Sequence, residues 1–191
     1  MTLSFKALQQ LHNSRKTQIS DYDPKWIQLF EKELLLLHSI FGEVALIIHH
    51  IGSTAIPGIK AKPIIDILIT TNSIHAIDNF DDQMEQSDYV IGGEFGLVGR
   101  RFYCKGDDQH CHFHVHVYEA THPSVEKYLL FRDYMIAHPN DAKDYESLKT
   151  DLATKYPNNR TLYTKSKGEF IDKILEKAGL SQILCTFQKR H

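Results

Sequence analysis

Apolar residues recur along the chain with two periods, one typical of helices and one typical of strands. Between Trp26 and Ile40 they recur every three to four residues, which predicts an amphipathic helix. Its expected apolar side comprises Trp26, Leu29, Phe30, Leu34 and Leu37. Asp23 as N-cap and Pro24 as first helical residue mark its start, and Gly42 marks its end.

Runs rich in β-branched and aromatic residues predict the strands of a sheet. The expected strands are 44–51, 64–70, 89–91, 101–105 and 111–118. The run 64–70 is almost continuously apolar, so we expect it to be central and covered on both faces. A glycine-rich loop is expected over 92–99, and a turn over 106–108 joins the last two strands.

The remaining segments predict helices. They are 73–87, 124–138, 141–156 and 161–178, with breaks at Pro139 and Pro157. This order of elements predicts a single domain over 1–191 of the α+β (mixed α/β) class. Its central mixed sheet is flanked by helices, its C-terminal part is helical, and residues 1–20 are expected to form a loosely ordered N-terminal segment.

Composition and charge exclude several classes of protein. The 22 basic and 24 acidic residues give a formal charge of −2, so bulk nucleic-acid binding is not expected. The apolar runs 34–37 and 44–48 are far shorter than the roughly 20 residues that span a bilayer. The N-terminus lacks the apolar core of a signal peptide, and Cys104, Cys111 and Cys185 form no recognisable framework. We therefore expect three thiols and a cytoplasmic protein, of unknown oligomeric state.

The turn Gly52-Ser53-Thr54 is the first candidate for a site, because it directly follows a predicted strand. Backbone N–H groups of such a turn and the two hydroxyls can hold phosphate oxygens. Asp66 lies inside the next apolar strand, where a buried carboxylate needs a partner or a metal ion such as Mg²⁺. The alternative is an ordinary turn, with Asp66 hydrogen-bonded in the core.

Histidines are unusually frequent, twelve in all, and His110, His112, His114 and His116 alternate in one run. A strand places His112, His114 and His116 on one face, where they could bind a metal ion or phosphate. The alternative is a polar sheet face. His49 and His50 must point to opposite faces, so at most one of them joins a site.

Basic residues flank both candidate segments. Lys62 precedes the Asp66 strand, and Arg100 and Arg101 follow the glycine-rich loop. Arginine suits bidentate phosphate contacts, so these side chains are candidate phosphate clamps. The alternative is solvated surface charge.

Taken together in this order, the motifs resemble the GrpB family from Tyr22 to about Leu175. The matching stretches are Tyr22-Asp-Pro-Lys-Trp26, His50-Ile-Gly-Ser-Thr54, Pro57-Gly58, Lys62-Pro-Ile-Ile-Asp-Ile67, Gly99-Arg-Arg-Phe102, His112-Phe-His-Val115, Leu130-Phe-Arg-Asp-Tyr134, Ala137-His-Pro139 and Tyr163-Thr-Lys-Ser-Lys167. The family is grouped with the nucleotidyltransferase superfamily, so the resemblance implies a nucleotidyltransferase-like mixed sheet flanked by helices. Some members are fused to dephospho-CoA kinase.

The resemblance also assigns roles to residues. Gly52 and Ser53 match the phosphate-binding turn, and Asp66 matches the first metal carboxylate. Leu68 stands where the superfamily usually has a second acid. Glu94 and the histidine strand are the candidates to replace the missing acids.

The first hypothesis is therefore a metal-dependent nucleotidyltransferase that acts on a nucleoside triphosphate and an unknown acceptor. Its divalent metal is expected to be Mg²⁺, with Mn²⁺ or Zn²⁺ as alternatives. The expected metal ligands are Asp66, His112, His114 and Glu94; the expected phosphate-binding residues are Gly52, Ser53, Thr54, Lys62, Arg100, Arg101 and Lys167. Asp66 is also expected to be catalytic, and His50 or His114 would take the acceptor's proton.

Two other hypotheses remain open. The first is a non-catalytic module that binds a nucleotide, a CoA-like ligand or another phosphorylated small molecule, which Leu68 favours. The second is a hydrolase whose metal ion is held by His112, His114 and His116.

Overall fold

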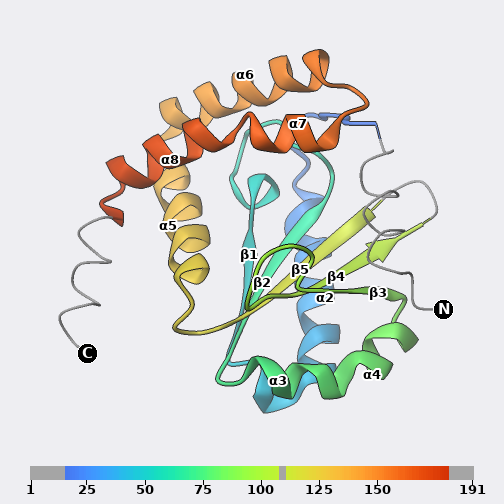
Figure 1. The fold of residues 1–191 in the computed structure, drawn as a ribbon. Coiled ribbons are helices and arrows are strands. Elements are labelled where there is room, and N and C mark those ends of the chain that lie inside the picture. The colour runs from blue at the N-terminus through green and yellow to red at the C-terminus, as the bar shows by residue number, and fades with distance from the viewer. Residues whose placement is uncertain (1–15, 108–110, 181–191) are drawn as a thin grey trace.

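The computed structural model describes residues 16–107 and 111–180, and these residues form a five-stranded mixed sheet with helices on both faces (Figure 1). The strands are β1 (Ile47–Ile51), β2 (Ile65–Thr71), β3 (Tyr89–Gly93), β4 (Arg101–Gly106) and β5 (Cys111–Glu119). Their order across the sheet is β1-β2-β5-β4-β3. Strands β2 and β5 are parallel, and every other neighbouring pair is antiparallel. The predicted α+β class with a mixed sheet is confirmed.

The register of the strands decides which side chains share a face. Asp66 lies opposite His114 on β5, and His116 lies opposite Phe102 on β4. Because side chains alternate along a strand, the even-numbered residues of β2 and of the paired part of β5 point to one face. The odd-numbered residues, such as Ile67 and Val115, point to the other face and form the main core.

The main core lies between the sheet and the helices that follow β2 or precede β1. These are α2 (Lys25–Phe41), η1 (Gly42–Val44), α3 (Ile74–Ile77), η3 (Asp78–Phe80) and α4 (Asp81–Gln86). The predicted single helix over 73–87 is thus divided into three short helices.

Helix α2 was predicted with nearly correct ends but with an error on its buried side. It buries Trp26, Leu37 and Phe41, whereas Leu29 is 44% exposed. Glu33 takes the buried position instead, because it accepts hydrogen bonds from Tyr89 Oη (2.7 Å) and Lys105 Nζ (2.8 Å). A buried carboxylate needs such partners.

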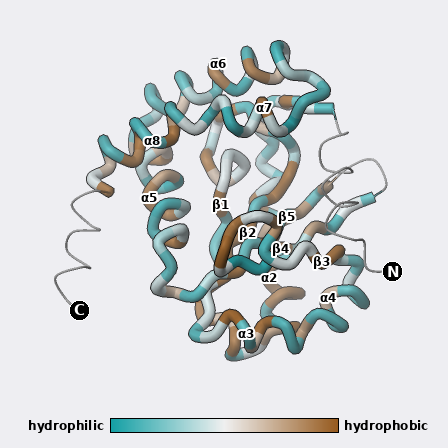
Figure 2. Tube along the Cα trace, viewed as in Figure 1, coloured by the Kyte–Doolittle hydropathy of each residue, from teal (hydrophilic) through white to brown (hydrophobic). Residues whose placement is uncertain are grey.

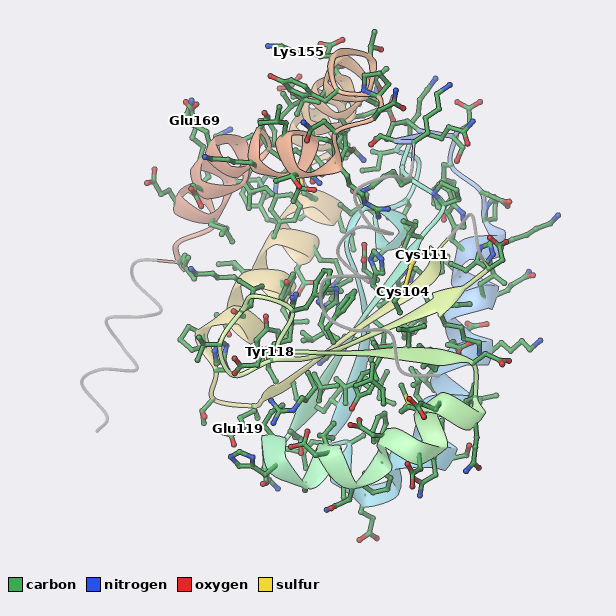
Figure 3. The ribbon with its side chains drawn as sticks, turned by 45° about the vertical axis from the view of Figure 1, so that its right-hand side comes forward. Cys104, Cys111, Tyr118, Glu119, Lys155 and Glu169 are labelled. Atoms are coloured by element: carbon green, nitrogen blue, oxygen red, sulfur yellow. A yellow bond between two sulfur atoms is a disulfide. The ribbon has the colours of Figure 1, made fainter. Side chains whose placement is uncertain are left out.

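The opposite face of the sheet meets the C-terminal helices. These are α5 (Pro123–Ala137), α6 (Pro139–Lys155), α7 (Arg160–Lys165) and α8 (Gly168–Lys177), joined there by η2 (Ser53–Ala55). The predicted helix over 161–178 is two helices, and the second begins at Gly168, a poor helix former. Figure 2 shows that hydrophilic residues predominate along α6 and α7. Lys155 and Glu169 are exposed on the outer side of this layer (Figure 3).

Cys104 and Cys111 form a disulfide between β4 and β5 (Figure 3). The expectation of three unpaired thiols is therefore wrong. The two strands are antiparallel neighbours, which brings the Cα atoms within 6.5 Å of each other. Cys185, His110 and Asp108 of the predicted turn lie outside the described residues.

Two further expectations were a loosely ordered segment over residues 1–20 and apolar runs too short to span a bilayer. Thr17 N donates to Pro157 O (2.8 Å), and Ser20 pairs with Ala61, while residues 1–15 lie outside the described part. Among the helices of the described ranges, none has both the length and the apolar character needed to cross a bilayer.

Candidate functional site

A cavity of about 350 Å³, here called the Asp66 cavity, lies between the even-numbered face of the sheet and the C-terminal helices. Its basic lining residues are Lys62, Arg100, Lys149, Arg160 and Lys167. Its aromatic lining residues are Phe95, Phe102, Tyr128, Phe131, Tyr145 and Tyr163. Asp66 is the single carboxylate among the lining residues that the structure describes.

The turn after β1 is built against the Asp66 side chain. Gly52 has φ 72°, a left-handed conformation that glycine adopts without strain. A Cβ atom at this position would lie 2.5 Å from Asp66 Oδ2. Glycine is therefore required both by the backbone conformation and by the approach to the carboxylate. Ser53 and Thr54 of the same turn also line the cavity.

Two imidazoles of β5 surround the Asp66 carboxylate, and one of them donates a hydrogen bond to it. His114 Nδ1 donates to Asp66 Oδ1 (3.0 Å), and His116 Nε2 faces the same oxygen at 3.8 Å. Burial alone would raise the pKa of Asp66, but the two histidines outweigh it and hold that pKa well below its usual range. Burial lowers the pKa of His114 to about 4 and lowers that of His116, so both imidazoles are neutral near pH 7.

Arg100 contacts both His116 and the glycine-rich loop. It determines which nitrogen of His116 carries the proton, and it holds the loop through two carbonyl oxygens. Arg100 Nη1 donates to His116 Nδ1 (3.3 Å), so neutral His116 carries its proton on Nε2, the atom that faces Asp66. Arg100 also donates to the carbonyl oxygens of Phe95 (2.8 Å) and Glu94 (3.1 Å). The guanidinium carbon lies 5.0 Å from the centre of the Phe102 ring.

Two lysines stand over one tyrosine at the α7 side of the cavity. Lys62 Nζ and Lys167 Nζ each lie 4.8 Å from the centre of the buried Tyr163 ring. Burial and the positive charges of Arg160 and Lys167 hold the pKa of Lys62 well below its usual value. This part of the cavity therefore favours a negatively charged ligand.

Lys149 and Arg160 are site residues that were not foreseen from the sequence. Lys149 is 1% exposed and donates from Nζ to Lys60 O (2.5 Å). Burial, with a contribution from Lys167, lowers the pKa of Lys149 to about 7. A signal was available, because Lys149 interrupts the buried stripe of α6 formed by Ala142, Tyr145 and Leu152.

His50 is not placed to act on a ligand in the Asp66 cavity. It pairs across the sheet with Ile67, on the side of the main core, where its ring stacks on Phe30 (4.8 Å between centres). Its Nε2 lies 3.0 Å from Thr54 Oγ1, which itself donates to Ile64 O (3.2 Å). The predicted proton-accepting role of His50 and the phosphate-binding role of the Thr54 hydroxyl are therefore corrected: both groups hold the turn.

Arg101 and Glu94 also lie outside the cavity. Arg101, the neighbour of Arg100 in a strand, points to the opposite face and forms a bidentate pair with Asp78 (Nη2 to Oδ2, 2.8 Å). Glu94 is exposed and accepts from Gly99 N (2.7 Å), which closes its own loop. The predicted phosphate clamp at Arg101 and metal ligand at Glu94 are thus wrong in placement.

A bulge removes His112 from the face of His114 and His116. Lys105 pairs with Phe113 but Gly106 pairs with Cys111, so β5 has one extra residue, His112, at this point. His112 is exposed, lies 3.3 Å (Nε2) from Asp107 Oδ2, and borders a different cavity beside Trp26 and Lys32. The prediction that His112 shares the cleft of Asp66 is wrong.

A pair of magnesium ions does not fit the described lining of the Asp66 cavity. Leu68, at the position of the second acid, is fully buried among Ile51, Tyr118 and Val125. The ligand atoms of Asp66, His114 and His116 lie within 4.8 Å of one another. However, the histidine nitrogens that face Asp66 carry protons, so this group is a hydrogen-bonded network rather than a set of open metal ligands.

Comparisons with known proteins agree with one another. A family model described as GrpB protein matches residues 16–177. The UPF0157 protein YqkA of Bacillus subtilis is 46% identical over 168 residues, which cover 88% of this chain but only 49% of YqkA. The glutamate-rich protein GrpB of Alkalihalophilus pseudofirmus is 37% identical, with 86% of this chain and 97% of that protein covered. The crystal structure of conserved protein GrpB from Enterococcus faecalis has a TM-score of 0.81 and 36% identity, over 87% of this chain and 99% of that one.

Proposed function

The chain belongs to the GrpB family, and we propose that it binds a nucleoside triphosphate or a related phosphorylated small molecule in the Asp66 cavity. The observation that carries the proposal is the charge of the lining: five basic side chains face one carboxylate. In the described part of the chain, no carboxylate forms an ion pair with Lys62, Lys149, Lys167 or Arg100. Gathering these basic groups in one cavity is costly, as the lowered pKa values of Lys62 and Lys149 indicate, and an anionic ligand relieves that cost.

The cavity lining offers both kinds of group that such a ligand needs, basic side chains and aromatic rings. Arginine and lysine groups bind phosphate oxygens; Lys62 and Lys167 lie over the Tyr163 ring, and Arg100 lies over the Phe102 ring. Aromatic side chains offer stacking surfaces to a planar base. A volume of about 350 Å³ is within the range of small-molecule sites. A nucleotide and a CoA-like ligand both carry these two chemical features.

Binding is better supported than nucleotidyl transfer. Transfer in the manner of the superfamily needs carboxylates for two metal ions, and Asp66 has no carboxylate neighbour in the described lining. In the proposed mode, the five basic side chains neutralise the phosphates directly, and the Asp66 network holds Arg100 and the Gly52 turn in place. A single divalent ion at Asp66 is the alternative, and release of pyrophosphate would favour transfer.

Calorimetric titration with ATP tests the proposal. We expect saturable binding in the presence of a chelator, with affinity lowered about tenfold by Lys167→Gln, which corresponds to about 1.4 kcal/mol. Lys165→Gln is the matched control, because Lys165 is exposed on α7 and does not line the cavity. Binding that requires Mg²⁺ would favour the metal-dependent alternative. Absent binding in both conditions, or equal losses in the two variants, would reject the site.

A further inference from the structure

Two buried cysteines that the proposed function does not use lie beside His114 of the Asp66 network. They are Cys104 and Cys111, and the ligand atoms of Cys104, Cys111 and His114 all lie within 4.8 Å of one another. Cys104 is the direct cross-strand neighbour of His114. Neither cysteine lines the Asp66 cavity, and both are buried against Ile64 and Phe102.

The bulge at His112 is what completes this group. Strict alternation from His114 would turn Cys111 toward the main core. The extra residue in β5 reverses that alternation, so Cys111 reaches the face of Cys104 and packs in the same cluster. The bulge therefore has a chemical consequence: it keeps His112 out of the cavity and places the sulfur of Cys111 beside that of Cys104.

The protonation of His114 suits a metal ligand. Its Nδ1–H donates to Asp66, so Nε2 of the neutral ring carries the lone pair. Metal-binding histidines typically donate their other N–H to a carboxylate in this way, which fixes the ring and strengthens the ligand. Two thiolates and one imidazole are the donor set that Zn²⁺ prefers, and a Cys₂His set leaves one of four positions for a non-protein ligand.

We propose that the reduced protein binds one Zn²⁺ ion through Cys104, Cys111 and His114, and that the disulfide and the zinc site are alternative states of the same cysteines. A dithiol reductant supplies two electrons and two protons, which convert the disulfide to two thiols. Binding of Zn²⁺ then releases both thiol protons to solvent. In reverse, a disulfide oxidant takes two electrons from the two thiolates and two protons from solvent; the protein disulfide forms, the oxidant becomes two thiols, and the ion leaves. The inference stands whether or not the cavity binds a nucleotide.

Metal titration of the full-length protein, without nucleotide, tests the proposal. We expect the reduced protein to bind one equivalent of Zn²⁺ in competition with a chromophoric chelator, and the oxidised protein to bind none at this site. Co²⁺ in place of Zn²⁺ should give the thiolate-to-metal charge-transfer absorption of two cysteine ligands. Cys104→Ser or Cys111→Ser should weaken Zn²⁺ binding about hundredfold, and Cys185→Ser should leave it unchanged.

If a serine variant does not fold, Zn²⁺ titration and Co²⁺ absorption of the wild-type protein still decide the question. Equal Zn²⁺ binding by the reduced and oxidised protein, or Co²⁺ absorption without thiolate charge transfer, would overturn the proposal. Loss of binding in Cys185→Ser with retention in Cys104→Ser would also overturn it. Asp66→Asn should weaken Zn²⁺ binding about tenfold through His114, because carboxylate partners of metal-binding histidines contribute at this level. His112→Gln should have no effect.

Discussion

Gly52 and Asp66 are fitted to each other so closely that a Cβ atom on Gly52 would lie 2.5 Å from Asp66 Oδ2. Because Ile51, the residue before the turn, pairs with Asp66 across the sheet, the turn and the carboxylate are fixed by the same strand register. Asp66 in turn accepts a hydrogen bond from His114 of β5, and His116 of the same strand accepts one from Arg100. The turn, the carboxylate and the cationic cavity thus form one unit.

Replacement of Gly52 tests this unit. Gly52→Ala should destabilise the fold by more than the about 1–2 kcal/mol expected for a side chain in left-handed backbone, because the methyl group also meets the carboxylate. Gly58→Ala is the matched control: Gly58 has φ 78°, but no atom lies within 4 Å of its added Cβ. Urea unfolding measures both. Equal decreases in the free energy of unfolding of the two variants would show that the contact with Asp66 adds nothing to the cost of Gly52→Ala.

Replacing Arg100 should lower ATP affinity, whereas the same replacement of Arg101 should not. Arg100→Gln should lower ATP affinity about tenfold or more, because the guanidinium lines the cavity and holds the Phe95 loop. Arg101→Gln should leave affinity unchanged, since Arg101 pairs with Asp78 on the other face. Titration calorimetry on the two variants decides this. A loss of ATP affinity in Arg101→Gln alone would place the phosphate site on the face of Asp78, opposite the Asp66 cavity, and would contradict the proposal.

Proton uptake should accompany ligand binding above neutral pH. The pKa of Lys149 is about 7, so at pH 8 this side chain is mostly neutral before binding. An anionic ligand raises that pKa, and the protein takes up a proton from the buffer. At pH 6 Lys149 is already charged, so its share of the uptake disappears.

Calorimetry at pH 8 in buffers of different ionisation enthalpy measures this effect. We expect about one proton per ligand from Lys149, with a further contribution from Lys62, whose pKa is lowered by burial and by the charges of Arg160 and Lys167. Lys149→Met should remove the Lys149 share. Identical heats in all buffers would contradict the assignment of Lys149 to the ligand site.

Glu33 should matter for stability and not for ligand binding. Glu33→Gln weakens the hydrogen bond from Lys105 in the main core, and we expect a loss of about 2–3 kcal/mol in the free energy of unfolding. Glu31→Gln, at an exposed position of the same helix, should change stability by less than about 0.5 kcal/mol. ATP affinity should stay at the wild-type level in both. A drop in affinity would mean that the two faces of the sheet are coupled.

The alternation of side chains along the strands correctly predicted that Asp66 and His114 share a face, but it could not show that His112 lies elsewhere. Alternation on β2 and β5 places Asp66 and His114 on one face, and the register makes them direct neighbours. The same alternation wrongly included His112, because a one-residue bulge leaves no trace in the hydrophobic pattern. It also could not say which of His49 and His50 faces the site side, since that depends on the pairing of β1 with β2.

The basic residues of the helical layer depend on tertiary packing. Lys149 and Arg160 line the same cavity as Asp66 only because α6 and α7 pack over the sheet. Even so, a charged residue on a buried helical stripe is a usable signal. Lys149 on α6 and Glu33 on α2 both stand at such positions. One lines the candidate site and the other forms a core ion pair, so the signal finds the residue without assigning its role.

The most direct test of the central claim is a crystal structure of the protein with a non-hydrolysable ATP analogue, grown in chelator. The account predicts the triphosphate in the Asp66 cavity, within hydrogen-bonding distance of Arg100 and of at least one of Lys62 and Lys167. It also predicts the base against the aromatic lining. Electron density for the analogue only in the cavity beside Trp26 and His112, or no bound analogue at saturating concentration, would contradict it.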